Sequence, residues 1–192
     1  ESLSLWADLA EVLSLRIADQ DGSEESVELR ERLGRLLVEE LGRGEDAMSV
    51  YGALLEGAPE NQAYLDTLSE LAEKTGQWAE LTKILERVVA EVDGADDRIR
   101  LLRIAGQNYE THQSLPAMAV DAYRRIIEDE PNDAAALEAL ERLYFATEQW
   151  TDLLEIYRVQ LNNIETSADR LNKRFQMAQL REEFLSDPHA AI

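Results

Sequence analysis

The even spacing of the three tryptophans constrains the fold of this chain more than any other feature of its sequence. Trp6, Trp78 and Trp150 stand 72 residues apart each time. Each opens the pattern Trp-x-x-Leu, with a further apolar or aromatic residue four positions on, as in LWADLAEVL, QWAELTKIL and QWTDLLEIY. Self-similarity at a fixed period indicates an array of repeated units, each of which buries an apolar face against its neighbour.

A shift of the sequence by 72 residues brings small, aromatic and turn-forming residues into register. The matching positions are Leu9, Leu81 and Leu153; Gly34, Gly106 and Ala178; Ala47, Ala119 and Ala191; Tyr51 and Tyr123; Pro59 and Pro131. We therefore expect a single repeat domain over residues 1–192, with units at 6–77 and 78–149 and a truncated unit at 150–192. Because the last residues align with the start of a helix in the earlier units, we expect this chain to be a fragment of a longer array.

Each unit has the pattern of amphipathic helices. The matching positions recur at helical spacing, and no stretch shows the period of two that is typical of strands. Gly, Pro, Asn and Asp interrupt the pattern, and several breaks combine a capping side chain with a proline near the first helical turn. Short loops between the helices favour antiparallel hairpins, so we expect an all-α chain of about ten helices. The expected helices cover residues 4–19, 25–41, 45–57, 61–75, 78–92, 96–112, 116–129, 133–147, 150–164 and 168–185, and an eleventh begins at Pro188.

Two hairpins per unit give a sub-period of about 36 residues, and the chain resembles the tetratricopeptide repeat (TPR) in this respect. That motif places Leu-Gly, Ala, an aromatic residue and Pro at fixed positions, which are occupied here by Leu33-Gly34, Ala47, Tyr51 and Pro59, and again by Ala105-Gly106, Ala119, Tyr123 and Pro131. The intervening hairpins, 62–93 and 134–165, match more loosely, because Asp93 and Glu165 stand where the motif has Pro. The resemblance covers essentially the whole chain and implies an α-α superhelix, or solenoid, of TPR-like antiparallel helix hairpins.

The repeated small residues and the tryptophans are interpreted as packing residues. Gly34 and Ala47 would let the two helices of a hairpin approach closely, and Tyr51 would fill the gap to the next hairpin. We expect the tryptophans to lie in the core, where each would bury ~150–250 Å², so that Trp78→Ala would be severely destabilising. A binding role is the alternative, although a specific ligand rarely needs the same residue in every repeat.

The composition excludes several classes of partner. Acidic residues outnumber basic ones by 40 to 19, and the formal net charge is −21. Nucleic-acid binders need a basic surface that displaces counterions, and anionic membranes attract basic segments for the same reason, so we expect neither partner. The acidity has two interpretations, a solvated surface that aids solubility or the steering of a basic partner. No window is apolar enough to span a membrane, and no targeting signal is visible, so a soluble cytoplasmic protein is the default expectation.

No residue pattern predicts catalysis or a metal site. Cysteine is absent and the two histidines, His112 and His189, are not paired, which argues against zinc. The segment DQDGSE at residues 19–24 lacks the order of acidic residues and the twelfth-position Glu of a calcium loop. No nucleotide-binding, metalloprotease or hydrolase motif occurs. We therefore expect a non-enzyme without a cofactor.

The resemblance implies that the first helices of successive hairpins line a concave groove that binds a peptide or protein segment. The candidate groove residues are Glu31, Arg35, Asp66, Glu70, Arg100, Arg103, Gln107, Glu138, Arg142 and Phe145. Glu31 is replaced by Arg103 and then Phe175 in successive units, as expected where a constant scaffold carries a specialised surface. The carboxylate clamp of the chaperone-binding members is absent. We expect an acidic groove with a cationic spot at Arg100 and Arg103, suited to a partner with basic residues and at least one acid; pairing of the arginines with nearby glutamates is the alternative.

The leading hypothesis is a non-catalytic protein-interaction scaffold. A self-assembling spacer, whose exposed ends associate with further repeats, is the structural alternative. A third hypothesis is a non-catalytic domain of a larger enzyme or signalling protein. The net charge argues against a fourth, a helical-repeat RNA binder.

Overall fold

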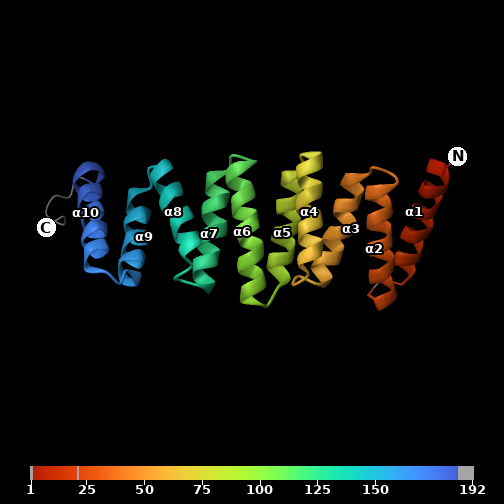
Figure 1. Cartoon of the computed structure of the whole chain (residues 1–192), viewed down its shortest axis with the longest axis horizontal. Helices are drawn as coiled ribbons and strands as arrows, with labels where there is room; N and C mark the ends of the chain where they lie inside the picture. The colour runs from red at the N-terminus through yellow and green to blue at the C-terminus, as the bar shows by residue number, and fades with distance from the viewer. Residues whose placement is uncertain (1, 21, 186–192) are drawn as a thin grey trace. The chain divides into compact units, whose positions relative to one another are not determined.

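Ten α-helices make up the part of the chain that the computed structural model describes, which is residues 2–20 and 22–185 (Figure 1). No strand occurs within these ranges, and the predicted all-α chain of helix hairpins is confirmed. Every helix begins and ends within two residues of its predicted bounds. The eleventh helix expected from Pro188 lies outside the described residues. The helices are α1 (Ser2–Asp19), α2 (Glu24–Glu39), α3 (Gly44–Gly57), α4 (Gln62–Thr75), α5 (Trp78–Glu91), α6 (Ala95–Thr111), α7 (Pro116–Asp129), α8 (Ala134–Ala146), α9 (Trp150–Asn163) and α10 (Ser167–Phe184).

The contacts within the chain divide it into two compact units, Glu1–Asp97 and Arg98–Ile192. In the first unit each helix from α1 to α5 packs on the next, and α3 also contacts α5. In the second unit α7, α8, α9 and α10 pack in the same sequential way. Both units are therefore built from antiparallel hairpins whose alternate helices form two rows.

Local side chains fix where several helices begin and end. Ser23, Asn61, Asp133 and Thr166 precede α2, α4, α8 and α10, and each side chain accepts a hydrogen bond from a backbone N–H of the first helical turn. Helix α4 ends at Gly76, whose φ of 72° lies in the left-handed region that glycine adopts without strain. These residues are the local breaks that the sequence pattern contains, which is why the predicted bounds are close to those observed.

In two of the hairpins, a glycine in the first helix lies directly against a tyrosine ring in the second helix. A Cβ placed on Gly34 of α2 would stand 2.8 Å from Cε2 of Tyr51 in α3, and one on Gly106 of α6 would stand 2.9 Å from Cζ of Tyr123 in α7. Both tyrosines are buried. The matching glycine and tyrosine positions of the sequence thus make the same close contact in each unit, and this hairpin packing is TPR-like.

The tryptophans are not core residues, so that expectation was wrong. Trp6, Trp78 and Trp150 are all half-buried, whereas Leu81 and Leu153, one turn after two of them, are completely buried. Trp78 and Trp150 are the first residues of α5 and α9. A side chain at a helix end lies at the edge of the packed layer, so that one part of the indole remains exposed. We accordingly expect Trp78→Ala to destabilise less than the loss of a fully buried indole.

Gly34→Ala is expected to destabilise the protein, because the added methyl group would meet the Tyr51 ring. Overpacking of a core contact costs about 1–3 kcal/mol, more than the ~0.5–1 kcal/mol that Ala gains over Gly inside a helix. The matched control is Gly57→Ala, because Gly57 lies in α3 with no atom within 4 Å of the added Cβ. Urea unfolding followed by circular dichroism at 222 nm should show a loss for Gly34→Ala and no loss for Gly57→Ala. Equal effects of the two substitutions would contradict the close contact.

Candidate functional site

A buried tyrosine connects the two candidate helices of the first unit. The Tyr64 hydroxyl of α4 donates a hydrogen bond of 2.6 Å to Oε1 of Glu31 in α2. Burial, and then the bond to the Glu31 carboxylate, raise the pKa of Tyr64 to about 12, so the phenol stays protonated and remains a donor. The Tyr64 ring also lies 6.3 Å, centroid to centroid, from the Tyr51 ring. Glu31 therefore holds α2 and α4 together as well as facing solvent in part.

The other predicted site residues of the first unit are exposed on the same two helices. Arg35 lies one turn after Glu31 on α2, and Asp66 and Glu70 lie one turn apart on α4. Asp66 accepts a bond of 2.7 Å from Nε2 of Gln62, and Glu70 lies 3.4 Å from the ammonium of Lys74, its neighbour on the same helix. Exposed ion pairs of this kind contribute little to stability, so their carboxylates can exchange partners. The α2–α4 surface, defined by Glu31, Arg35, Asp66 and Glu70, is accordingly acidic and accessible.

In the second unit, Arg103 is bound to the residue that caps a neighbouring helix. Its Nη2 donates a hydrogen bond of 2.7 Å to Oδ2 of Asp133, while Oδ1 of Asp133 accepts one of 2.8 Å from the backbone N–H of Ala136. Burial opposes ionisation of Asp133, but the bonds from Ala136 and Arg103 outweigh it and lower the pKa of this carboxyl group. Arg103 thus joins α6 to the first turn of α8.

Arg142 and Lys173 make two further ion pairs between alternate helices. Arg142 of α8 donates two bonds, of 3.0 and 2.8 Å, to the two carboxylate oxygens of Glu110 in α6. The ammonium of Lys173 in α10 lies 3.5 Å from Glu141 of α8 and 4.4 Å from the centre of the Tyr157 ring. With Arg103–Asp133, these pairs connect α6, α8 and α10, the row that contains the candidate residues of the second unit.

The remaining candidates of the second unit differ in exposure. Arg100 is half-buried, and Gln107 and Glu138 are exposed. Phe145, at the end of α8, is 56% exposed and meets Trp150 edge to face with 5.6 Å between ring centroids. Trp150 in turn stacks on Phe184 of α10 at 4.2 Å. The structure therefore brings Phe145 into an aromatic cluster, which sequence reasoning missed because it treated Trp150 as a core residue.

The sequence reasoning also missed the acidic partners of the arginines and lysine. Asp133 could be identified as a helix cap, because it aligns with Asn61, which caps α4 in the first unit. Its bond to Arg103 joins residues that are 30 positions apart in the chain. Nothing in the local pattern signals that pairing, which depends on how α6 and α8 are aligned.

A hollow in the second unit is lined by a candidate residue, whereas one in the first unit is not. In the second unit, a cavity of about 280 Å³ is lined by Leu137, Ile164, Glu138 and Gln160, among others. The Nε2 of Gln160 donates to Glu141 at 2.8 Å, while its buried Oε1 has no hydrogen-bond partner among the described residues. The Gln160 carbonyl is therefore a buried acceptor with unused capacity at this cavity.

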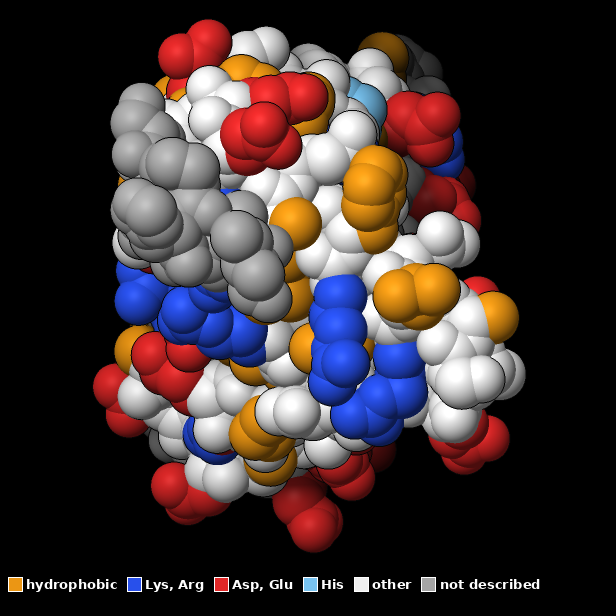
Figure 2. All heavy atoms as spheres, turned by 90° about the vertical axis from the view of Figure 1, so that its left-hand side faces the viewer, with side chains coloured by type: hydrophobic (Ala, Val, Ile, Leu, Met, Phe, Trp, Pro, Cys, Tyr) orange, Lys and Arg blue, Asp and Glu red, His pale blue; other side chains and the backbone are white. Residues whose placement is uncertain are grey.

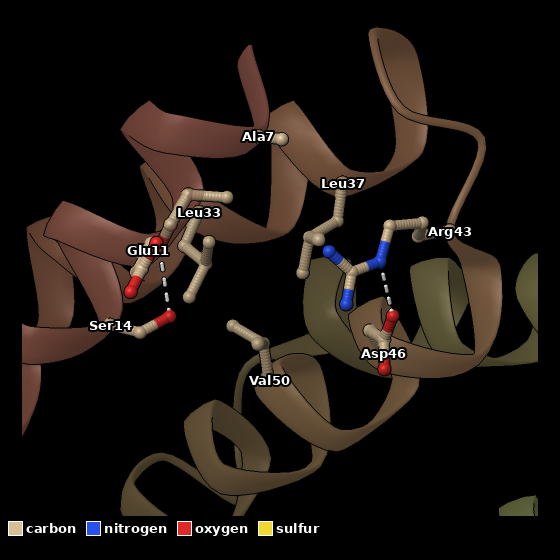
Figure 3. Close-up of a pocket in the computed structure, with 9 residues that line it drawn as sticks. Ala7, Glu11, Ser14, Leu33, Leu37, Arg43, Asp46 and Val50 are labelled. Carbon is tan, nitrogen blue, oxygen red and sulfur yellow. Dashed lines mark hydrogen bonds and ion pairs between the residues drawn. The ribbon is translucent and has the colours of Figure 1, made fainter. Parts of the chain in front are cut away.

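In the first unit, a cavity of about 500 Å³ lies among α1, α2 and α3 (Figure 3). Leu33, Leu37 and Val50 form apolar walls, and the ion pair between Arg43 and Asp46 lies at one side. The cavity is on the side of α2 that faces α1, and none of the predicted site residues lines it.

The described residues contain no group of three or more His, Asp and Glu side chains that could hold a metal ion. His112 is exposed just after α6, and His189 lies outside the described residues, as does Asp21 of the DQDGSE segment. No helix in this part of the chain has the length and apolar character needed to cross a membrane.

No protein-family model and no curated protein matches this chain. Among solved structures, one described as the MamA RS-1 ArsTM double mutant is 12% identical over 86% of this chain and 88% of its own, with a TM-score of 0.46. A tetratricopeptide repeat protein from Parabacteroides merdae is 15% identical over 96% of this chain and 70% of its own, with a TM-score of 0.45. Because both TM-scores are low, the TPR-like character of the fold rests on the hairpin packing of Gly34 and Gly106 against their tyrosines.

Asp133→Ala is expected to destabilise the protein by about 1–3 kcal/mol, because it removes a helix cap and the partner of Arg103. Asp133→Asn keeps the cap, as Asn61 does in the first unit, and should cost less. The folded-state pKa of Asp133 lies below its ordinary 3.8, so its ionised form adds stability above that pH and loses it as the pH falls through the lowered pKa. Urea unfolding should therefore show a gap between wild type and Asp133→Asn at neutral pH that closes in acid. Equal losses for Ala and Asn would contradict the role of the cap, and a gap independent of pH would contradict the ion pair.

Proposed function

We propose that this protein is a non-catalytic interaction scaffold that binds a peptide or protein segment on the outward faces of α2 and α4 in the first unit, with a separate binding surface on α6 and α8 in the second. The proposal rests on one comparison between equivalent positions of the two units. Their interior packing contacts are the same, but their exposed side chains differ. Gly34–Tyr51 and Gly106–Tyr123 make the same packing contact, whereas the exposed Arg35 and its exposed equivalent Gln107 differ in charge. Residues that vary at a fixed position of a conserved framework suit recognition better than support of the fold.

The α2–α4 surface favours a partner that carries lysine or arginine. Asp66 and Glu70 expose carboxylates there, and the half-buried Glu31 lies beside them on α2. The net charge of −21 attracts a basic segment at long range, and the local carboxylates would orient it. Arg35 is available on the same surface for a single acidic group of the partner.

The second unit would offer a separate surface with contacts of another kind. Arg103 and Arg142 are bound to Asp133 and Glu110, so in this proposal they hold α6 and α8 in place. Gln107 and Glu138 offer hydrogen-bonding groups on the exposed face, and Phe145 offers an aromatic surface. A segment bound there would make apolar contacts and hydrogen bonds more than ion pairs.

The test measures fluorescence anisotropy of two short labelled peptides that differ only in carrying Lys or Glu at alternate positions. We expect the Lys peptide to bind the full chain, with an affinity that falls as salt is added, and the Glu peptide not to bind. Asp66→Lys combined with Glu70→Lys should weaken binding of the Lys peptide by roughly tenfold or more, which corresponds to ~1.4 kcal/mol.

The matched control is Asp152→Lys combined with Glu155→Lys, which changes the net charge equally on exposed positions of α9. This control should retain most of the binding. Equal losses in the two double variants would show that only the overall charge attracts the peptide, and the assignment of the α2–α4 surface would fail. Absence of binding to the wild-type chain at low salt would overturn the basic-partner proposal.

A further inference from the structure

The outward face of α10 in the second unit is apolar, with basic side chains along one side and the exposed Glu182 near its C-terminal end. Leu171 and Phe175 are 71% and 61% exposed and lie one turn apart, while Met177 and Leu180 on the opposite side are buried. Arg170 directly precedes Leu171, and Arg174 directly precedes Phe175. The two arginines therefore form a row along the helix beside the two apolar residues. Figure 2 looks at the side of the chain on which α10 lies, and shows Lys and Arg side chains beside hydrophobic ones, with Asp and Glu side chains around them.

The charge of α10 is exceptional in this acidic chain. It has four basic and three acidic residues, and it is the only one of the ten described helices in which basic residues outnumber acidic ones. Within the described part of the chain, Arg174 makes no hydrogen bond or ion pair. The face of α10 therefore offers at least one cation for an external acidic group, next to uncovered apolar side chains.

The outward face of α1 in the first unit has the complementary character. Leu5, Val12 and Leu15 are exposed, although Ala10 and Leu13 of the same helix are buried against the rest of the unit. Asp8 and Asp19 complete the same stripe, because positions 5, 8, 12, 15 and 19 follow the alternating spacing of three and four that keeps side chains on one face of a helix. This stripe is apolar with two acidic groups, which is the pattern that a basic and apolar helix face would accept.

We propose that α1 of one copy of this chain docks on α10 of another copy. The apolar residues of the two faces would cover one another, and Arg174 would pair with Asp8 or Asp19 at one end of the acidic stripe. Association of like faces is disfavoured, because two α1 faces would oppose their aspartates and two α10 faces would oppose their arginines. A contact between two different faces leaves one face of each kind unused in a dimer, so it propagates to larger assemblies. This inference goes beyond the scaffold role, since it uses neither the α2–α4 surface nor the candidate residues of α6 and α8.

The test uses two variants that each block one face. Val12→Arg would oppose the arginines of α10, and Phe175→Asp would oppose the aspartates of α1. Both positions are more than half exposed, so the fold should tolerate the changes, which circular dichroism and thermal unfolding would verify. The conservative variant Phe175→Leu keeps an apolar face and should behave like the wild type.

Sedimentation velocity at physiological ionic strength should show that the mass of the wild type increases with concentration beyond that of a dimer. Each blocked variant alone should remain a monomer. An equimolar mixture of the two should form dimers and nothing larger, because the intact α1 of Phe175→Asp can dock on the intact α10 of Val12→Arg.

Three outcomes would overturn the proposal: a wild type that stays monomeric at every concentration, a mixture that stays monomeric, or a blocked variant that still associates alone. The last outcome would indicate association of like faces. None of these measurements involves a peptide, so their failure would leave the peptide-binding test unaffected.

Discussion

The close contact between a glycine and a tyrosine ring inside a hairpin is the constraint on which the rest of the structure depends. At Gly34 and Gly106 the absence of a side chain lets the ring of Tyr51 or Tyr123 lie against the neighbouring helix backbone. Large rings can fill a hairpin only where the opposite helix has no side chain of its own, because protein interiors are packed as densely as organic crystals. This contact sets the distance between the helices of a hairpin, and hence the positions of the outward side chains on them.

The sequence was sufficient to predict the helices, because their ends are local features. Ser23, Asn61 and Asp133 cap the helices that follow them with their own side chains, and Gly76 ends α4 with a backbone conformation that suits glycine. The partners of the candidate site residues could not be predicted in the same way. Tyr64 meets Glu31 across 33 positions, and Arg142 meets Glu110 across 32, so each contact depends on how two helices are aligned. The half-burial of the tryptophans could not be predicted either. A residue repeated at equivalent positions indicates a similar environment in each repeat, but it does not tell how far the side chain is buried.

The two units use the same helix positions for different electrostatic purposes. In the first unit a neutral phenol bonds to the carboxylate of Glu31, which leaves the exposed acids of α4 to solvent or to a partner. In the second unit ion pairs between α6, α8 and α10 neutralise much of the charge of that row. Equivalent helices of the two units therefore offer a partner exposed carboxylates in the first unit and side chains that are largely paired in the second.

The bonds of Glu31 and Arg103 also have a consequence for how such an array can evolve by duplication. Both residues occupy one equivalent position, but Glu31 bonds to the first helical turn of α4 through Tyr64, and Arg103 bonds to the cap of α8 through Asp133. A substitution at this position alone would leave a partly buried polar group on the next helix without its partner. Duplicated repeats can thus diverge here only by paired substitutions on successive hairpins, and related sequences should show covariation of this position with the positions of Tyr64 and Asp133.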